Sequence, residues 1–178
     1  MSDFYRAPPV SWNRIAEMTE AFRRQLGLEE VNFFPIMEVL EEILDLRLGL
    51  VQIEVEEDPI MGDVEGFTDP AGEFIRFSQT VYLQACAHRP RARWTAAHEA
   101  AHFFLHARKP MTRVASQAVL KAFECPERQA HQFAAELLMP RRLIDPTTPV
   151  SDVMKDFGVS EEAAKKRLKF IASLHRNG

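Results

Sequence analysis

The residues best suited to chemistry lie in one short run, His98-Glu99-Ala100-Ala101-His102, which has the form HExxH. Two residues four apart on an α-helix share one face, so both imidazoles can bind the same metal ion. Glu99 projects beside them, where a carboxylate can take a proton from a water molecule at the metal. The motif fixes only three positions, so two surface histidines and a solvated glutamate would give the same sequence pattern.

The motif requires a helix, and the flanking sequence predicts one. Pro90 suits the first turn of a helix, and Pro110 ends the segment. Between the two prolines, apolar residues recur at helical spacing: Trp94, Ala97, Ala101 and Leu105. His98 and His102 border this apolar face, so we expect both imidazoles to be partly buried.

A third ligand is predicted on a second helix, over residues 126–140, which is also bracketed by prolines and carries an apolar stripe. Glu127 falls in its first turn, where the helix dipole stabilises a carboxylate, and it can face a metal on the neighbouring helix. Two histidines and one glutamate leave a fourth position open, as in a catalytic rather than a structural zinc site. Without the first helix, Glu127 would be only a favourable charge at a helix N-terminus.

His106 is a rival ligand, because it continues the row of His98 and His102 at the same spacing. Three successive turns span about 12 Å, and one ion with bonds of about 2 Å does not easily collect three ligands over that distance. We therefore expect His106 to cap carbonyls at the helix end or to hydrogen-bond another element.

These residues lie in two strings that resemble the ImmA/IrrE metallopeptidases. The first string covers residues 91–106 and contains HEAAH, and the second covers residues 127–140 and ends in Leu-Leu-Met-Pro. The resemblance is strong over about the central third of the chain. Two positions depart from the family pattern: Ala101 replaces the usual glycine, and His131 replaces the more common asparagine or aspartate.

The resemblance implies a zincin-like fold, one zinc ion bound by His98, His102 and Glu127, and Glu99 as the general base. It also implies the usual substrate, a helix-turn-helix transcriptional repressor cut at a single site to switch on genes of a mobile element or a stress response. The role of His131 stays open. It can accept a hydrogen bond from a ligating imidazole, donate to the reacting carbonyl oxygen, or leave the ligands less well supported.

Around these two helices the sequence predicts a mainly helical α+β fold with a small antiparallel sheet beside the metal-site helix. A turn signature at Asp69-Pro70-Ala71-Gly72 joins two of the strands as a hairpin. Further helices are expected over residues 12–26 and 35–48, and strands over residues 50–55, 66–68 and 74–77.

The last part of the chain, residues 147–178, is expected to form a helical extension packed on a metallopeptidase domain of residues 1–146. Its second helix begins after Ser160, a suitable N-cap. That helix carries a group of basic residues: Lys165, Lys166, Arg167, Lys169 and Arg176. A helix, a tight turn and a basic helix outline a helix-turn-helix unit, but a solvated Lys-rich face on a packing helix is the interpretation we favour.

Composition favours a cytoplasmic enzyme. The chain has 178 residues and a net charge of −4, so its surface as a whole does not suit nucleic acid. Its two cysteines form no CxxC pair, which argues against a zinc finger or a disulfide framework. The sequence predicts no signal peptide and no membrane-spanning segment. Direct nucleic-acid binding, if any, is expected only through the C-terminal extension.

These features together predict a zinc-dependent endopeptidase with one zinc ion per chain and a protein substrate. Glu99 is expected to take a proton from the attacking water and pass it to the leaving amine. The second donor to the oxyanion stays open among His131, Tyr82 and a backbone amide. Two alternatives come from other functional classes: a metal-binding regulator that does not cut, and a DNA- or protein-docking module acting through the C-terminal extension.

Overall fold

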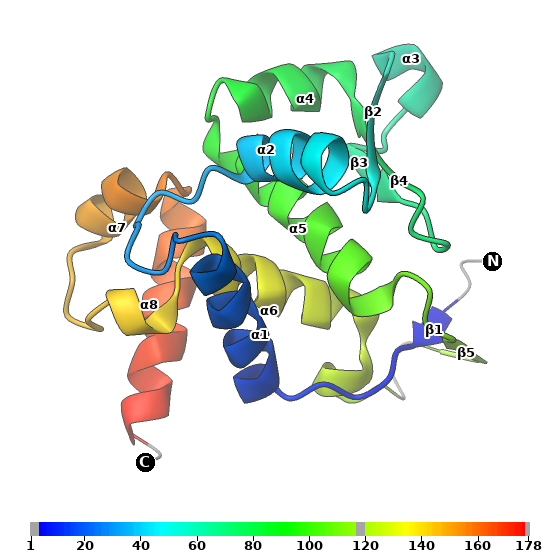
Figure 1. Cartoon of the computed structure of the whole chain (residues 1–178). Coiled ribbons are helices and arrows are strands. Elements are labelled where there is room, and N and C mark those ends of the chain that lie inside the picture. Colours follow the sequence, from blue (N-terminus) through cyan, green and yellow to red (C-terminus); the bar gives the residue numbers. More distant parts are fainter. Residues whose placement is uncertain (1–3, 117–119, 177–178) are drawn as a thin grey trace.

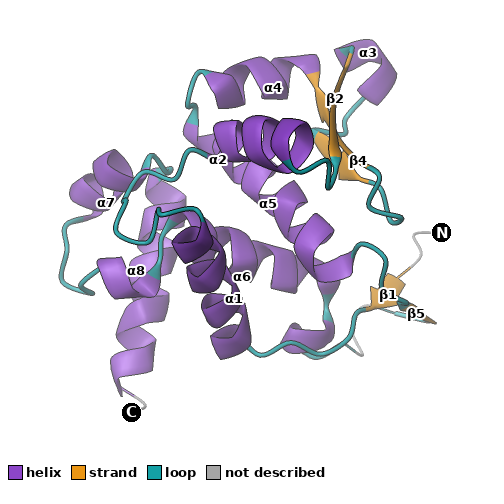
Figure 2. Ribbon diagram, in the orientation of Figure 1, coloured by secondary structure: helices purple, strands orange, loops and turns teal. Residues whose placement is uncertain are grey.

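The computed structural model describes residues 4–116 and 120–176, and helices form most of this part of the chain (Figures 1 and 2). The mainly helical α+β class is confirmed. The α-helices of the described residues are α1 (Trp12–Gln25), α2 (Ile36–Glu38), α3 (Asp58–Met61), α4 (Gln79–Cys86), α5 (Pro90–His106), α6 (Pro126–Leu138), α7 (Val150–Phe157) and α8 (Glu161–Arg176). A π-helical segment continues α2 (Val39–Arg47), and two 3₁₀ turns cover Ala122–Glu124 and Arg141–Leu143.

The strands are short and form two separate sheets. They are β1 (Phe4–Arg6), β2 (Gln52–Glu56), β3 (Gly66–Thr68), β4 (Phe74–Ser78) and β5 (Thr112–Val114). The larger sheet has the order β2-β4-β3, and the smaller one pairs β1 with β5. The predicted hairpin is present, because β3 and β4 are antiparallel. The expectation of a wholly antiparallel sheet is wrong: β2 joins the other side of β4 in parallel, since the chain crosses over through α3 and β3 before it reaches β4.

The long helix α5 lies at the centre of the molecule, between the larger sheet and α6 (Figure 1). Its buried faces are made largely of alanine, and α6 buries two alanines beside larger residues such as Phe133 and Leu137. Side chains this small let two helix axes approach closely, because little volume separates the backbones. The buried alanines are Ala92, Ala96, Ala97, Ala100 and Ala101 on α5, and Ala130 and Ala134 on α6.

The turn between α7 and α8 is fixed by a glycine and a buried arginine. Gly158 has φ +64°, and a Cβ there would lie 2.4 Å from the ring of Phe33. Only glycine fits both requirements. Arg93 of α5 donates to the carbonyls of Phe34 and Gly158, at 2.7 and 3.3 Å. Burial lowers the pKa of Arg93 to about 10, so its guanidinium stays charged at neutral pH.

The helix α8 is tied to α6 by a second buried arginine. Arg167 donates from Nε to the carbonyl oxygen of Met139 at 2.8 Å, and its guanidinium forms an ion pair with Glu136. Arg141 contacts the same carboxylate. Arg167 is therefore part of the core and not of a basic surface. The proposed boundary between residues 146 and 147 stays a prediction.

Two exposed lysines near the start of α8 are paired within the helix. Lys165 lies 2.5 Å from Glu161, and Lys166 lies 2.6 Å from Glu162. These i,i+4 pairs offset much of the positive charge near the start of the helix. This pairing agrees with the solvated face of a packing helix. Among the helices of residues 4–116 and 120–176, none is both long enough and apolar enough to cross a bilayer.

Replacing Arg167 with Met should lower the free energy of unfolding by about 3–5 kcal/mol, because the carboxylate of Glu136 stays buried with one partner fewer. Urea denaturation followed by circular dichroism measures this change. The matched control is Lys166→Met, which removes an exposed ion pair from the same helix and should leave stability near that of the wild type. Equal losses in the two variants would contradict the buried-pair argument.

The pKa of Glu136 sets the pH range of this effect. Burial alone would raise the pKa of this carboxyl, but Arg167 and Arg141 hold it below its ordinary value of 4.5. The ion pair therefore stabilises the folded chain above pH 4.5, and its contribution is lost as the pH falls through the lowered pKa. The stability gap between the wild type and Arg167→Met should accordingly narrow in acid.

Candidate metal centre

Two imidazoles of the HExxH motif meet on the face of α5 that looks toward α6. The Nε2 atoms of His98 and His102 are 3.0 Å apart. This closeness follows from helical geometry, since residues four apart lie one turn from each other on the same face. Both side chains are mostly buried, as their position at the border of the apolar face predicted.

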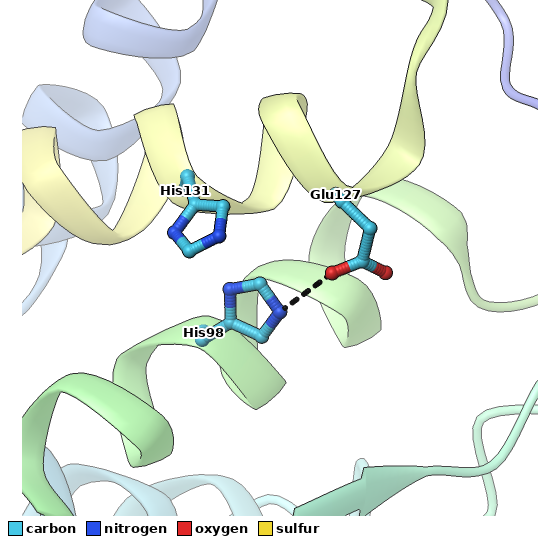
Figure 3. A group of neighbouring side chains, drawn as sticks. All are labelled: His98, Glu127 and His131. Carbon is cyan, nitrogen blue, oxygen red and sulfur yellow. Dashed lines mark ion pairs between the residues drawn. The ribbon is translucent and has the colours of Figure 1, made fainter. Parts of the chain in front are cut away.

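The carboxylate of Glu127 reaches the same point from the first turn of α6 (Figure 3). One of its oxygens lies 3.2 Å from Nε2 of His98, and the other lies 3.4 Å from Nε2 of His102. The structure thus brings the three predicted ligands together.

The spacing of these donors fits a zinc ion. Coordination bonds of about 2.0–2.1 Å in a tetrahedron separate neighbouring ligand atoms by about 3.3 Å. The observed separations are 3.0, 3.2 and 3.4 Å. The Glu127 side chain is 56% exposed, so the cluster is open to solvent on one side. A fourth ligand such as water can approach from there, as a catalytic metal site requires.

His131 offers a looser alternative to His102. Ligand atoms of His98, Glu127 and His131 all lie within 4.8 Å of one another (Figure 3). The group containing His102 is tighter, with no separation above 3.4 Å, so His102 is the better third ligand. Burial and the neighbouring His98 lower the pKa of His131.

The His131 ring lies against the His98 ring, with centroids 4.8 Å apart. The Nδ1 atom of His98 is buried and has no hydrogen-bond partner among the described residues. Support of His98 by His131 would therefore require a small movement of one ring. The three roles considered for His131 stay open.

Glu99 points toward the β3 strand and is only 8% exposed. The Thr68 hydroxyl lies 2.7 Å from Oε2 of Glu99 and 2.9 Å from its backbone oxygen. Gly66 makes this approach possible, since a Cβ there would lie 2.8 Å from Cγ of Glu99. Sequence reasoning did not assign Thr68 to the site, because residues 31 apart carry no local signal of contact.

His106 does not join the metal ligands, in agreement with the prediction that it hydrogen-bonds another element. Its Nδ1 lies 3.0 Å from Nδ1 of His102, and its Nε2 lies 2.8 Å from Oε1 of Gln129 on α6. Burial lowers the pKa of His106 to about 4, so its imidazole is neutral at physiological pH. The sequence did not predict the role of Gln129 either, because nothing in the pattern of an amphipathic helix sets one buried polar residue apart from the exposed ones.

Tyr82, one candidate donor to the oxyanion, is engaged elsewhere. Its hydroxyl donates to Glu41 at 2.7 Å, and this hydrogen bond raises the pKa of the phenol. Of the three donors considered, His131 and a backbone amide remain.

A large cleft with a volume of about 1040 Å³ opens beside His131, and the three proposed ligands are not among the residues that line it. Its walls come from the start of α5, from α6 and from α8. It reaches the metal site at His131 and the sheet at Glu65, the residue before β3. Its walls carry both aromatic and charged side chains, which include Trp12, Trp94, Arg91, Arg128 and Phe170.

The site lies inside a segment shared with a known family. The sequence profile of the IrrE N-terminal-like domain (Peptidase_M78) matches residues 52–169, about two thirds of the chain. The matched segment includes β3, α5 and α6, and therefore every residue of the candidate centre. No curated protein sequence is significantly similar to the chain.

Among solved structures, the chain is similar to a Mycobacterium tuberculosis transcriptional regulator, with a TM-score of 0.52 and 15% sequence identity. The match covers 86% of this chain and 46% of that one, so this chain spans less than half the length of the regulator. At this identity the likeness concerns the fold alone. The match to the family profile, over two thirds of the sequence, is stronger evidence. It shows that the chain belongs to the IrrE N-terminal-like domain family of peptidases.

Proposed function

We propose that this chain is a zinc-dependent endopeptidase in which His98, His102 and Glu127 hold the metal and Glu99 is the general base. The observation that carries the proposal is the convergence of three donor groups, from two helices, to separations of 3.0–3.4 Å. A structural zinc site would be closed by a fourth protein ligand, whereas this cluster is open to solvent at Glu127. Membership of a peptidase family supports hydrolysis as its chemistry.

Zinc, when bound, supplies Lewis acidity that polarises a peptide carbonyl and makes water a better nucleophile. Glu99 then has two tasks. It accepts a proton as the water oxygen bonds to the carbonyl carbon, and it delivers that proton to the nitrogen as the C–N bond breaks. The Thr68 hydroxyl, 2.7 Å from Oε2, holds the carboxylate in one orientation during both transfers.

The substrate is proposed to bind as an extended strand along β3. Within the described part of the chain, β3 pairs on one side only, with β4. Its other edge can accept a peptide backbone by strand addition. Glu65 directly precedes β3 and also lines the large cleft, so side chains of a peptide on this edge can enter the cleft on the side of His131.

The protein substrate is proposed to be a helix-turn-helix transcriptional repressor, cut to switch on genes of a mobile element or a stress response. The resemblance of the two ligand-bearing strings to ImmA/IrrE peptidases supports this choice. A structural neighbour described as a transcriptional regulator is compatible with it. The rival idea of a DNA-docking tail has less support, because Arg167 is buried and Lys165 and Lys166 are already paired.

The metal content of the purified chain tests the ligand set. We expect about one zinc per chain by elemental analysis, since two imidazoles and a carboxylate form a complete catalytic zinc site. His98→Ala and Glu127→Ala should each lose the metal. His175→Ala, which removes an exposed histidine from α8, is the control and should keep it. A wild-type chain that takes up no zinc would exclude the peptidase.

Glu99→Gln separates a peptidase from a metal-binding regulator that does not cut. The amide cannot accept the proton of the attacking water, so cleavage should be lost while zinc content stays unchanged. The measurement is gel analysis of helix-turn-helix repressors incubated with each zinc-loaded chain. Equal cleavage by wild type and Glu99→Gln would remove Glu99 from the mechanism, and cleavage by neither would favour the regulator.

Thr68→Val tests whether the hydroxyl positions Glu99. Valine keeps the shape of threonine but offers no donor, and a hydrogen bond to a charged group contributes about 1.5–3 kcal/mol. We therefore expect kcat to fall about tenfold or more, with KM and zinc content little changed. Thr68→Ser keeps the hydroxyl and should retain most of the activity. If serine and valine reduce kcat equally, the role of Thr68 is packing.

A further inference from the structure

Two buried polar residues outside the proposed ligand set connect one ligand to the rest of the protein. His106, on the last turn of α5, lies between His102 and Gln129 of α6. Gln129 in turn contacts the backbone at Pro8 and Phe123. His106 is 4% exposed and Gln129 is fully buried, so bulk water does not compete for these hydrogen bonds.

The direction of these hydrogen bonds can be read from Gln129. Its Nε2 lies 2.9 Å from the Pro8 carbonyl and 2.7 Å from the Phe123 carbonyl. A carbonyl only accepts, so both amide protons of Gln129 are used there. The remaining polar atom, Oε1, can only accept, and it faces Nε2 of His106 at 2.8 Å. Nε2 of His106 must therefore carry a proton.

The same reasoning fixes the next link. A neutral imidazole that is protonated on Nε2 has its lone pair on Nδ1. Nδ1 of His106 faces Nδ1 of His102 at 3.0 Å, so His102 must be the donor. With its proton on Nδ1, His102 presents a lone pair on Nε2, the atom that meets His98 and Glu127.

We infer that Gln129 and His106 are positioning residues that hold His102 in the tautomer whose Nε2 can bind a metal. The inference rests on the metal site of the proposed function. It gives the two ligand histidines different support, because Nδ1 of His98 has no partner among the described residues. The chain of hydrogen bonds ends at the backbone carbonyls of Pro8 and Phe123, which can only accept, so its direction is fixed.

Nitrogen-15 NMR of the metal-free, full-length chain at pH 8 tests the direction of the hydrogen bonds. Long-range proton–nitrogen correlations distinguish the two neutral tautomers of each histidine. We expect His102 to be protonated on Nδ1 and His106 on Nε2. Gln129→Leu removes the acceptor and should allow both tautomers of His106 and His102. A wild-type His102 protonated on Nε2 would overturn the inference.

Zinc affinity, measured by competition with a chelator, tests the consequence. His106→Leu should raise the dissociation constant of zinc about 10–100-fold, the usual effect of removing a group that orients a ligand. His106→Gln offers an amide oxygen to His102 and an amide proton to Gln129, and should recover much of that loss. A His106→Gln chain as weak as His106→Leu would show that packing alone matters, and would overturn the inference.

The Gln129→Leu, His106→Leu double variant completes the test. If the two residues act through one chain of hydrogen bonds, the double variant should bind zinc about as weakly as either single variant. Unchanged affinity in both single variants would contradict the positioning role. The NMR measurement needs no metal, so a wild-type chain that binds no zinc would defeat the proposed function while the spectra still decide the tautomers.

Discussion

The close approach of α5 and α6 is the constraint on which the centre depends. His98 and His102 come from one helix and Glu127 from the other, yet their donor atoms lie within 3.4 Å of one another. Side chains of ordinary length can meet in this way only if the two backbones are near, and the alanines on the facing stripes allow it. Ala101 stands where the family usually has glycine, and alanine is also small enough for this close approach.

The donor atoms meet only if α6 also has the right position along its axis, and buried arginines fix that position. Arg23 of α1 donates to the Leu137 carbonyl at 2.7 Å, and Arg167 of α8 donates to the Met139 carbonyl at 2.8 Å. Both carbonyls belong to the C-terminal end of α6, where backbone acceptors lack partners within the helix. Cations there also suit the helix dipole. Glu127, at the opposite end of α6, is placed by these anchors.

Much of the site followed from the sequence because its geometry is local. Helical spacing places His98 and His102 on one face, and the prolines around α6 place Glu127 in a first turn. Contacts between segments that are distant in the sequence could not be predicted from it. Thr68 reaches Glu99, and Gln129 reaches His106, only after the sheet and the two helices have packed. The same limit explains the parallel pairing of β2 with β4 and the missed pairing of β1 with β5, whose three-residue strands carry no periodic signal.

Among the described strands β3 pairs on one side only, and the proposed binding of a peptide along its other edge would have a consequence for selectivity. Strand addition needs a partner whose backbone donors and acceptors are available, and residues inside a helix have already used theirs. A folded helical domain would therefore resist an enzyme that binds its substrate in this way, even where the sequence of the domain fits the cleft. Cutting would be confined to linkers, or to segments that unfold locally, and its rate would follow the population of the opened form. Conformational stability of the target, as much as its sequence, would then decide when it is destroyed.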